Sequence, residues 1–246
     1  MTIKVAVIGA AGRMGRTVCD AVSQAEDLEL VAQIDAGVSI EGNLNGAQVA
    51  VEFTVPAVTE ANVHALLDCG VDVVVGTTGW TEESLARVGE HADATRRSVI
   101  IAPNYGLSAV LLMSFAEKAA PYFESVEVIE LHHPEKVDAP SGTATTTAKR
   151  ISAARVAAGV AASPDATQID PEGARGANVE GVHVHAVRLR GLNAHEEVLL
   201  GNPAEQLVLR QDSFDRTSFM PGVLLAIRNV MGRGGLTYGL DKVIDL

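Results

Sequence analysis

A glycine-rich turn directly after the first apolar run constrains the fold of this chain more than any other feature. Residues 4–8 are rich in β-branched side chains, Gly9, Gly12 and Gly15 follow at three-residue intervals, and a helical pattern begins at about residue 16. Glycines at such a junction let the chain turn tightly and let the helix pack closely on the strand. The turn therefore predicts that the chain begins with a strand–turn–helix unit.

Strands and helices then alternate through the first hundred residues. Apolar runs predict further strands at 28–35, 49–54, 71–75 and 98–102, and helical patterns end near Cys69 and cover 82–94. Alternation at this spacing is typical of βαβ units and a parallel sheet. The predicted fold class is therefore α/β, with an N-terminal Rossmann-like doubly wound parallel sheet.

The pattern changes near residue 107. It predicts helices over 108–119 and 143–158, strands over 126–131 and 182–190, and a hairpin from 197–200 and 206–210. The stretch 161–177, rich in Pro, Gly, Asp and Ala, is expected to be a loop, while a helix over 221–231 and the tail 236–246 are expected to pack back on the first domain. We therefore expect a dinucleotide-binding domain, 1–106 completed by 213–246, and an α+β domain for substrate binding and oligomerisation, 107–212.

Composition excludes several classes of protein. The 246 residues carry a net charge of −12, and no apolar run reaches the roughly 18 residues of a membrane span. The chain enters a strand directly after Met1, without the apolar segment of a signal peptide, so we expect a cytoplasmic protein. Aromatic residues make up only 4 % and form no basic–aromatic patch, which argues against nucleic acid. Cys19 and Cys69 belong to no ligand pattern, so no metal site is expected.

The glycine-rich turn is also a candidate dinucleotide site. A helix N-terminus supplies N–H groups and partial positive charge to a pyrophosphate, and glycines let the backbone approach it. The spacing departs from the usual G-x-G-x-x-G, because two alanines separate the first two glycines, and a turn without a ligand remains the alternative. The candidate cofactor-binding residues of this turn are Gly9, Ala10, Ala11, Gly12, Arg13 and Met14.

Asp35 bears on which cofactor is bound. It ends the second predicted strand, 20 residues past Gly15, where an acid accepts hydrogen bonds from the adenosine ribose of NAD. No arginine follows it to meet a 2′-phosphate, but Arg13 and Arg16 could do so from the turn. The sequence thus favours NADH and leaves NADPH open.

Two further segments close successive strands of the predicted sheet. In open α/β sheets, ligands bind beyond the carboxyl ends of the strands, so both segments are placed to line the nicotinamide side. The alternative is that they are ordinary strand-to-helix turns. The candidate residues are Gly76, Thr77 and Thr78 after one strand and Ala102, Pro103, Asn104 and Tyr105 after the next.

Cationic groups gather in a short stretch of the second domain. His132, His133 and Lys136 follow a predicted strand, and Ser141, Gly142 and Thr143 open a helix. Imidazole and ammonium groups move protons near neutral pH, and a helix start holds a carboxylate. A solvated turn is the alternative for the His-His pair alone. In an acidic chain, the whole cluster predicts a site for a small anionic substrate.

The residues that carry these sites resemble the 4-hydroxy-tetrahydrodipicolinate reductase family, also called the dihydrodipicolinate reductase family. The resemblance covers essentially the whole chain, and its most specific part is the string from Glu130 to Ala144, ELHHPEKVDAPSGTA. The strings VIGAAGRMG at 7–15, VGTTG at 75–79 and APNY at 102–105 match in the same order. Tyr105-Gly106 departs from the common family pattern, and no basic residue follows Asp35, which leaves the choice of cofactor open.

The resemblance implies an activity and a role for each residue of the cluster. The family reduces the cyclic product of aspartate semialdehyde and pyruvate to tetrahydrodipicolinate, in the diaminopimelate and lysine pathway. By motif position, His132 is a proton donor or acceptor and Lys136 the proton donor, while His133, Gly142 and Thr143 bind the dicarboxylate substrate. The N–H groups from Ser141 to Thr143 are placed to hold its carboxylates.

The resemblance also implies a homotetramer built through the second-domain sheets. Strands over 182–210 alternate, and their apolar faces exceed what a helix over 143–158 covers, while open sheet edges favour association. A monomer, with the loop 161–177 lying over the sheet, is the alternative. Two rival functions are another two-domain oxidoreductase, such as an aldose or semialdehyde dehydrogenase, and a non-catalytic NAD-sensing regulator. The semialdehyde type needs a cysteine in the cleft and the regulator a basic face, and the sequence offers neither.

Overall fold

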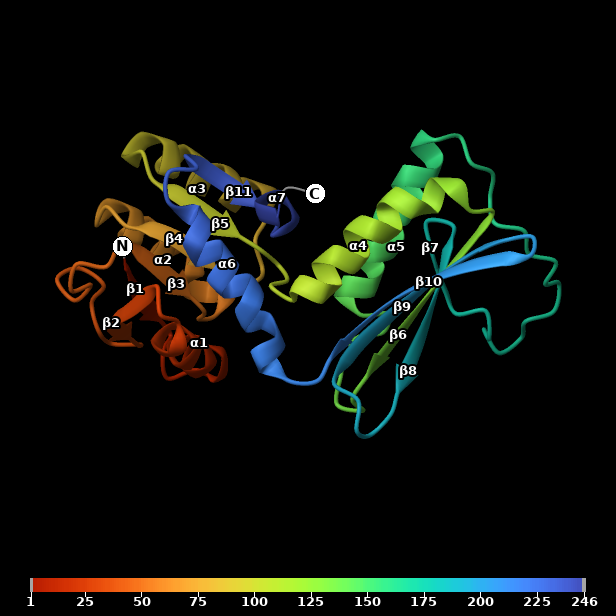
Figure 1. The fold of residues 1–246 in the computed structure, drawn as a ribbon, viewed down its shortest axis with the longest axis horizontal. Coiled ribbons are helices and arrows are strands. Elements are labelled where there is room, and N and C mark those ends of the chain that lie inside the picture. The colour runs from red at the N-terminus through yellow and green to blue at the C-terminus, as the bar shows by residue number, and fades with distance from the viewer. Residues whose placement is uncertain (1, 245–246) are drawn as a thin grey trace. The chain divides into compact units, whose positions relative to one another are not determined.

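The structure, a computed structural model, describes residues 2–244. The chain forms two compact units (Figure 1): one contains the residues up to Leu107 and those from Arg216 onward, and the other is Ser108–Asp215. Between 2 and 244, no helix is long and apolar enough to cross a membrane. The predicted class, a Rossmann-like parallel sheet followed by an α+β unit, is confirmed.

The first unit is built around a six-stranded sheet in the order β11-β5-β4-β3-β1-β2, with every pair of neighbours parallel. Its strands are β1 (Ile3–Ile8), β2 (Leu28–Ile34), β3 (Val49–Glu52), β4 (Asp72–Val75), β5 (Ser98–Ile101) and β11 (Gly235–Tyr238). Every residue of β3, β4 and β5 is buried, because helices cover both faces of the sheet. Continuous apolar strands are typical of such a doubly covered sheet.

The helices of this unit pair on opposite faces of the sheet. They are α1 (Arg13–Gln24), α2 (Pro56–Asp68), α3 (Glu82–Thr95), α6 (Met220–Val230) and the short α7 (Asp241–Ile244). Helices α2 and α3 share one apolar core with one face of the strands, and α1 contacts α6 on the other face (Figure 1). The expected tail over 236–246 is a strand and a short helix as far as it is described, and β11 extends the sheet beside β5.

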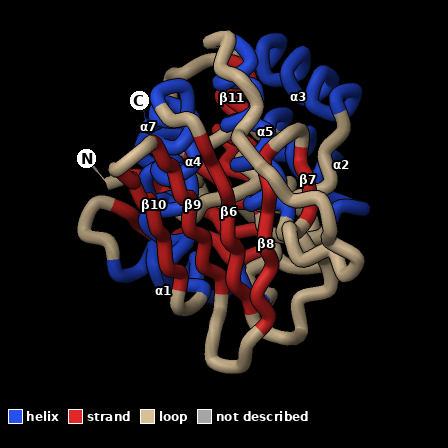
Figure 2. The backbone as a smooth tube through the Cα atoms, turned by 90° about the vertical axis from the view of Figure 1, so that its right-hand side faces the viewer, coloured by secondary structure: helices blue, strands red, loops and turns tan. Residues whose placement is uncertain are grey.

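The second unit holds a five-stranded mixed sheet in the order β10-β9-β6-β8-β7 (Figure 2). Its strands are β6 (Ser125–His132), β7 (Ala177–Val179), β8 (Val182–Arg188), β9 (Ala194–Asn202) and β10 (Glu205–Ser213). Strands β6 and β8 are parallel, and the other neighbours are antiparallel. The predicted hairpin is confirmed as β9–β10, with longer strands than expected. Strand β7 was not predicted. It begins at the last residue of the predicted loop 161–177 and ends before the predicted strand 182–190.

One face of this sheet is covered and the other is largely open. Helices α4 (Leu107–Ala119) and α5 (Gly142–Ala157) form one core with the covered face, so two helices do what the sequence assigned to one. The 3-10 turns η1 (Ala120–Tyr122) and η2 (Arg216–Phe219) were not expected. On β10, the uncovered Val208 is 45 % exposed and lies beside Leu199 of β9.

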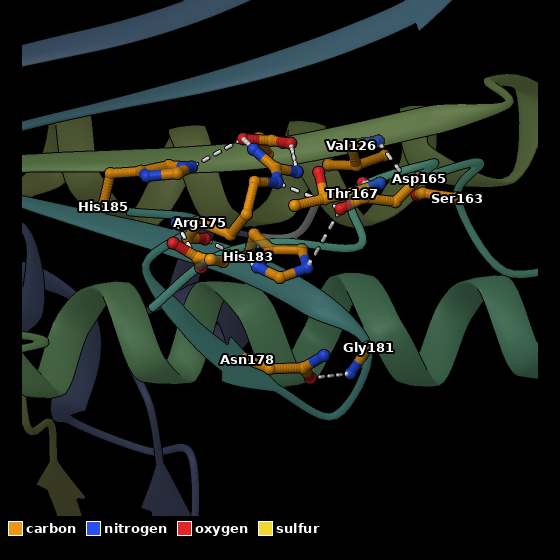
Figure 3. Close-up of polar contacts among 11 residues, drawn as sticks. Val126, Ser163, Asp165, Thr167, Arg175, Asn178, Gly181, His183 and His185 are labelled. Carbon is orange, nitrogen blue, oxygen red and sulfur yellow. Dashed lines mark hydrogen bonds and ion pairs between the residues drawn. The ribbon is translucent and has the colours of Figure 1, made fainter. Parts of the chain in front are cut away.

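Arg175 makes the main polar contacts between the open face and the loop before β7. Arg175 pairs with Glu127 of β6 and donates from Nε to Asp165 at 3.0 Å (Figure 3). His185 of β8 lies 2.6 Å from the same Glu127 carboxylate, and His183 donates from Nδ1 to the Arg175 carbonyl at 2.7 Å. The loop thus covers the face at β6 and β8, whereas β10 remains exposed.

Candidate functional site

The glycine-rich turn brings the start of α1 close to the end of β1. Gly9 has a φ of +81°, and its N–H donates to the Ile34 carbonyl at 2.7 Å. A Cβ on Gly15 would lie 1.9 Å from the Gly9 carbonyl oxygen, so only glycine lets α1 begin this close to β1. Gly12 is the N-cap residue of α1 and has no side chain, so no N-cap side chain accepts a hydrogen bond from the first N–H groups of the helix.

Asp35 supports this turn directly. Its two carboxylate oxygens accept from the Ala11 N–H at 2.9 and 3.0 Å. The acid that the sequence placed near a ribose therefore also holds the turn in its shape. Ala10 and Ala102 are buried and act as packing at the ends of their strands.

Two cavities flank the turn at the carboxyl ends of the strands. They share Gly12, Phe53 and Thr54 and have volumes of about 410 and 550 Å³. The larger is lined by Gly9 and Asp35, among others. Of the residues that the sequence singled out, the smaller is lined by Gly12, Arg13, Met14, Gly76, Thr77, Thr78, Pro103, Asn104 and Tyr105. Most of the predicted cofactor residues thus surround one continuous region.

Sequence reasoning missed several lining residues. Phe53 and Thr54 end the third predicted strand, so the rule that singled out residues 76–78 could have found them. Phe219, from the far end of the chain, also lines the smaller cavity, and no local pattern pointed to it. Val38 and Asn62 line the larger cavity and carry no motif.

A buried carboxylate holds several residues that line these cavities. Glu52 ends β3, is fully buried, and accepts from the hydroxyls of Thr59 and Thr77 at 2.7 Å each. The Thr54 hydroxyl and the Asn62 amide also donate to it. Glu52 therefore holds in place two residues that line the smaller cavity, Thr54 and Thr77.

Tyr105 contributes shape rather than acid chemistry. Its hydroxyl donates to the Val75 carbonyl at 2.8 Å, and the ring packs against Phe53 with centroids 6.0 Å apart. Burial holds the pKa of the Tyr105 hydroxyl well above its ordinary value. At neutral pH the group is a donor committed to the sheet.

In the second unit, the histidine pair lies where β6 ends. His132 is the last residue of the strand, and its Nδ1 donates to Glu130 Oε2 at 2.6 Å. Burial lowers the pKa of His132 and outweighs the opposing effect of Glu130. His133 is 43 % exposed on its side chain and lies 3.3 Å from the Glu135 carboxylate.

Lys136 and the start of α5 meet at one carboxylate. Lys136 Nζ donates to Asp138 Oδ1 at 2.7 Å. Hydrogen bonds from Lys136 and, to a smaller extent, from the Gly142 backbone lower the pKa of Asp138. The Asp138 carboxylate therefore interacts with both the Lys136 ammonium group and the start of α5.

Ser141 serves the protein itself. It caps α5, with its hydroxyl accepting from the Ala144 N–H at 3.1 Å, and its own N–H donates to Glu130 at 3.0 Å. The backbone N–H and the hydroxyl oxygen of Ser141 therefore both make hydrogen bonds within the protein. In the described part of the chain, no group of three or more His, Cys, Asp or Glu residues could hold a metal ion.

Comparison with known proteins gives a consistent result. Residues 3–105 match the family model described as dihydrodipicolinate reductase, N-terminus, and residues 108–244 match the one described as its C-terminus. A 4-hydroxy-tetrahydrodipicolinate reductase of Beutenbergia cavernae is 61 % identical over 247 residues, covering 100 % of both chains. One from Streptomyces coelicolor is 57 % identical, over 99 % of this chain and 98 % of its own.

Solved structures agree. A dihydrodipicolinate reductase from a Paenisporosarcina species, described as dipicolinate-bound, superposes with a TM-score of 0.89 at 37 % identity, covering 98 % of this chain and 99 % of its own. An amine dehydrogenase from Mycobacterium smegmatis, 14 % identical with a TM-score of 0.62 and coverage of 98 % and 96 %, shares the fold. The resemblance first indicated by the string at 130–144 is confirmed, and the chain belongs to the dihydrodipicolinate reductase family.

Proposed function

We propose that this chain is an NAD(P)H-dependent 4-hydroxy-tetrahydrodipicolinate reductase of diaminopimelate and lysine biosynthesis. The observation that carries the proposal is the cluster at the end of β6, where His132, Lys136 and the start of α5 stand together. A reductase of this kind also needs a place for a dinucleotide, and the cavities around the glycine-rich turn of the first unit would provide it.

The reaction needs one hydride and one proton. Loss of the 4-hydroxyl together with a proton from the neighbouring ring carbon releases water and leaves a conjugated C=C–C=N system. Reduced nicotinamide would supply a hydride to the carbon that carried the hydroxyl, and the neighbouring carbon would then take one proton. The products are tetrahydrodipicolinate, NAD(P)⁺ and water. A positioned acid accelerates such a proton transfer by roughly 10²–10⁴-fold.

We assign the proton donation to Lys136 and a partner role to His132. Lys136 is an ammonium ion held by Asp138, and substrate binding would exchange that carboxylate for one of the substrate. His132 donates from Nδ1, so its neutral ring has a lone pair at Nε2 with which to accept a proton or a hydrogen bond.

The remaining residues of the cluster would bind the substrate. A dicarboxylate needs fixed positive partners, and His133 together with the N–H groups at Gly142 and Thr143 would provide them without a long flexible side chain. Ser141 would take part through its cap of α5, which fixes that helix start.

The cofactor assignment rests on the first unit. The pyrophosphate would lie at residues 9–14, the adenosine ribose at Asp35, and the nicotinamide near residues 76–78 and 102–105. The carboxylate of Asp35 favours NADH, and Arg13 keeps NADPH possible.

We further infer a cytoplasmic homotetramer built through the sheets of the second unit. The open face supports this inference, since Val208 of β10 and Val187 near the end of β8 are exposed on it, and the loop fixed by Arg175 covers only part of β6 and β8. Exposed apolar strands favour association with another copy.

One coupled assay tests the function. A synthase makes the substrate from aspartate semialdehyde and pyruvate, and the protein is added with NADH or NADPH. Absorbance at about 340 nm, the signal of reduced nicotinamide, should fall only when the synthase product is present. No substrate-dependent fall with either cofactor would refute the proposed function.

A further inference from the structure

We propose that Glu130 is the positioning residue of this site, fixing the proton on Nδ1 of His132 and holding the chain between β6 and α5 in its working shape. The inference rests on the proposed function, in which His132 exchanges protons or hydrogen bonds with the substrate. It assigns a role to a fully buried acid that does not itself need to meet substrate or cofactor.

The Glu130 carboxylate is surrounded by four donors. Oε2 accepts from His132 Nδ1 at 2.6 Å and from Arg188 Nη1 at 2.7 Å. Oε1 accepts from Arg188 Nη2 at 2.8 Å and from the Ser141 N–H at 3.0 Å. An ionised carboxylate only accepts hydrogen bonds, and guanidinium and backbone N–H groups only donate, so Glu130 has no proton to donate. The proton between Glu130 and His132 therefore belongs to Nδ1.

This arrangement determines the tautomer of His132. A neutral imidazole that carries hydrogen on Nδ1 has its lone pair on Nε2. The same logic orients histidines in catalytic dyads, where a buried carboxylate holds the ring and stabilises the imidazolium when it forms. Burial tends to raise the pKa of Glu130, but the hydrogen bonds from Arg188 and His132 prevail and hold it below the ordinary value, which keeps the partner anionic.

Glu130 also joins three segments of the chain. Arg188 ends β8, Ser141 precedes α5, and His132 ends β6. Arg188 further donates to the Asp138 carbonyl at 2.7 Å, and the neighbouring Leu189 N–H donates to the His132 carbonyl at 3.1 Å. Both ends of the stretch that carries Lys136 are thereby tied to one carboxylate–guanidinium pair.

The other ionisable groups near His132 are few. Lys136 and Arg188 both act to lower its pKa, and Glu130 alone among the three acts to raise it. Glu196 of β9 lies beside Glu130, at the paired position across the two strands. Loss of the Glu130 charge should therefore leave His132 harder to protonate.

The substitution Glu130→Gln tests the role, with Glu196→Gln as a matched control. Both acids lie on the covered face at paired positions and are buried, with 0 % and 2 % of their surface exposed. Each oxygen of the Glu130 carboxylate now accepts from two donors. In glutamine at 130, the NH₂ group would replace one of these oxygens and would face two donors. We expect kcat to fall by about 10²-fold or more in E130Q and to stay within about threefold of wild type in E196Q. NADH affinity should be unchanged in both, because the cofactor residues lie in the first unit.

A second readout does not depend on activity. The ¹⁵N shifts of labelled histidine, assigned by the signal lost in H132A, report which ring nitrogen of His132 carries hydrogen. Wild type should show hydrogen on Nδ1, and E130Q should show a changed tautomer mixture and a lower His132 pKa, with E196Q keeping the wild-type tautomer.

The outcomes separate the two proposals. An inactive wild type would refute the reductase function and leave the tautomer result standing as a test of Glu130. Unchanged kcat in E130Q, a fall of equal size in E196Q, or an unchanged His132 tautomer in E130Q would overturn the positioning role. If E130Q does not fold, the wild-type spectrum decides, since hydrogen on Nε2 would contradict the proposal.

Discussion

Glu196 lies directly opposite Glu130 across β9 and β6, yet the two buried carboxyl groups have pKa values shifted in opposite directions. Hydrogen bonds from Arg188 and His132 lower the pKa of Glu130, whereas burial, with a smaller contribution from the Glu130 charge, raises that of Glu196 to about 7. Among the described residues, Glu196 Oε1 has no hydrogen-bond partner. Glu196 is therefore the acid of this pair that takes up a proton near neutrality.

This difference predicts a pH-dependent loss of stability. Because the folded chain holds the Glu196 proton more tightly than the unfolded chain, the stabilisation is complete below about pH 4 and is lost as pH rises to about 7. The shift corresponds to roughly 3 kcal/mol. Urea unfolding of E196Q, which stays neutral, should show a shallower decline between pH 5 and 8 than wild type, and parallel curves would contradict the prediction.

Substitutions in the cluster should separate chemistry from binding. H132A and K136A are expected to lower kcat by about 10²-fold or more, because each removes a proton-handling group, while H133A mostly raises KM for the substrate. Steady-state kinetics with K149A, an exposed lysine of α5, and H91A, a histidine of α3, provide controls. Near-wild-type kcat in both H132A and K136A would refute the assignment.

The cofactor preference should follow Asp35. We expect kcat/KM with NADH to equal or exceed that with NADPH, because in the proposed cofactor site the carboxylate would accept from a ribose hydroxyl and would repel a 2′-phosphate. D35N keeps an oxygen for the Ala11 N–H and loses the charge, so it should shift the ratio toward NADPH. A tenfold preference of wild type for NADPH would mean that Arg13 or Arg16 outweighs Asp35.

Gly15→Ala should distort the glycine-rich turn between β1 and α1. Its Cβ would lie 1.9 Å from the Gly9 carbonyl oxygen, a backbone atom that cannot move without opening the turn. We expect unfolding free energy to fall by about 3 kcal/mol and NADH binding to weaken. Gly89→Ala in α3 is the control, because its nearest contact would be an ordinary 3.7 Å and alanine favours helix. Equal thermal stability of the two variants would contradict the steric argument.

The assembly prediction is tested by mass. Light scattering at micromolar concentration should give about four times the single-chain 25.7 kDa. V208R would place a charge on the open face of β10 and should shift the distribution toward smaller species. A wild-type mass near that of one chain would reject the tetramer.

The sequence predicted most elements because their signals are local. Apolar runs that end just before a glycine indicated β1 and β4, and the string at 130–144 indicated the cluster. Strand β7 was missed because three residues between turns carry no periodicity, and β11 because a four-residue strand at a sheet edge depends on its partner β5.

The supporting groups of the sites could not be predicted in this way. Glu130 stood inside the quoted string, but its partner Arg188 lies 58 residues away, and only the register of β6 and β8 brings them together. The sequence around Glu52 shows only an acid at the end of an apolar strand. Its role depends on the hydroxyls of Thr59 and Thr77, which donate to it in the folded chain. Hydrogen bonds between distant segments leave no local pattern.

The order of the strands in the first sheet has a consequence for synthesis on the ribosome. Strand β5 remains an unprotected edge until residues 235–238 emerge, because β11 is its outer neighbour. Ser108–Asp215 is a single uninterrupted stretch that is already complete by then, and domains tend to fold as units. The unit whose synthesis begins first is therefore the unit that completes its sheet last. In a nascent chain that lacks residues 235–238, the second unit can already be folded while the sheet of the first unit still lacks its edge strand.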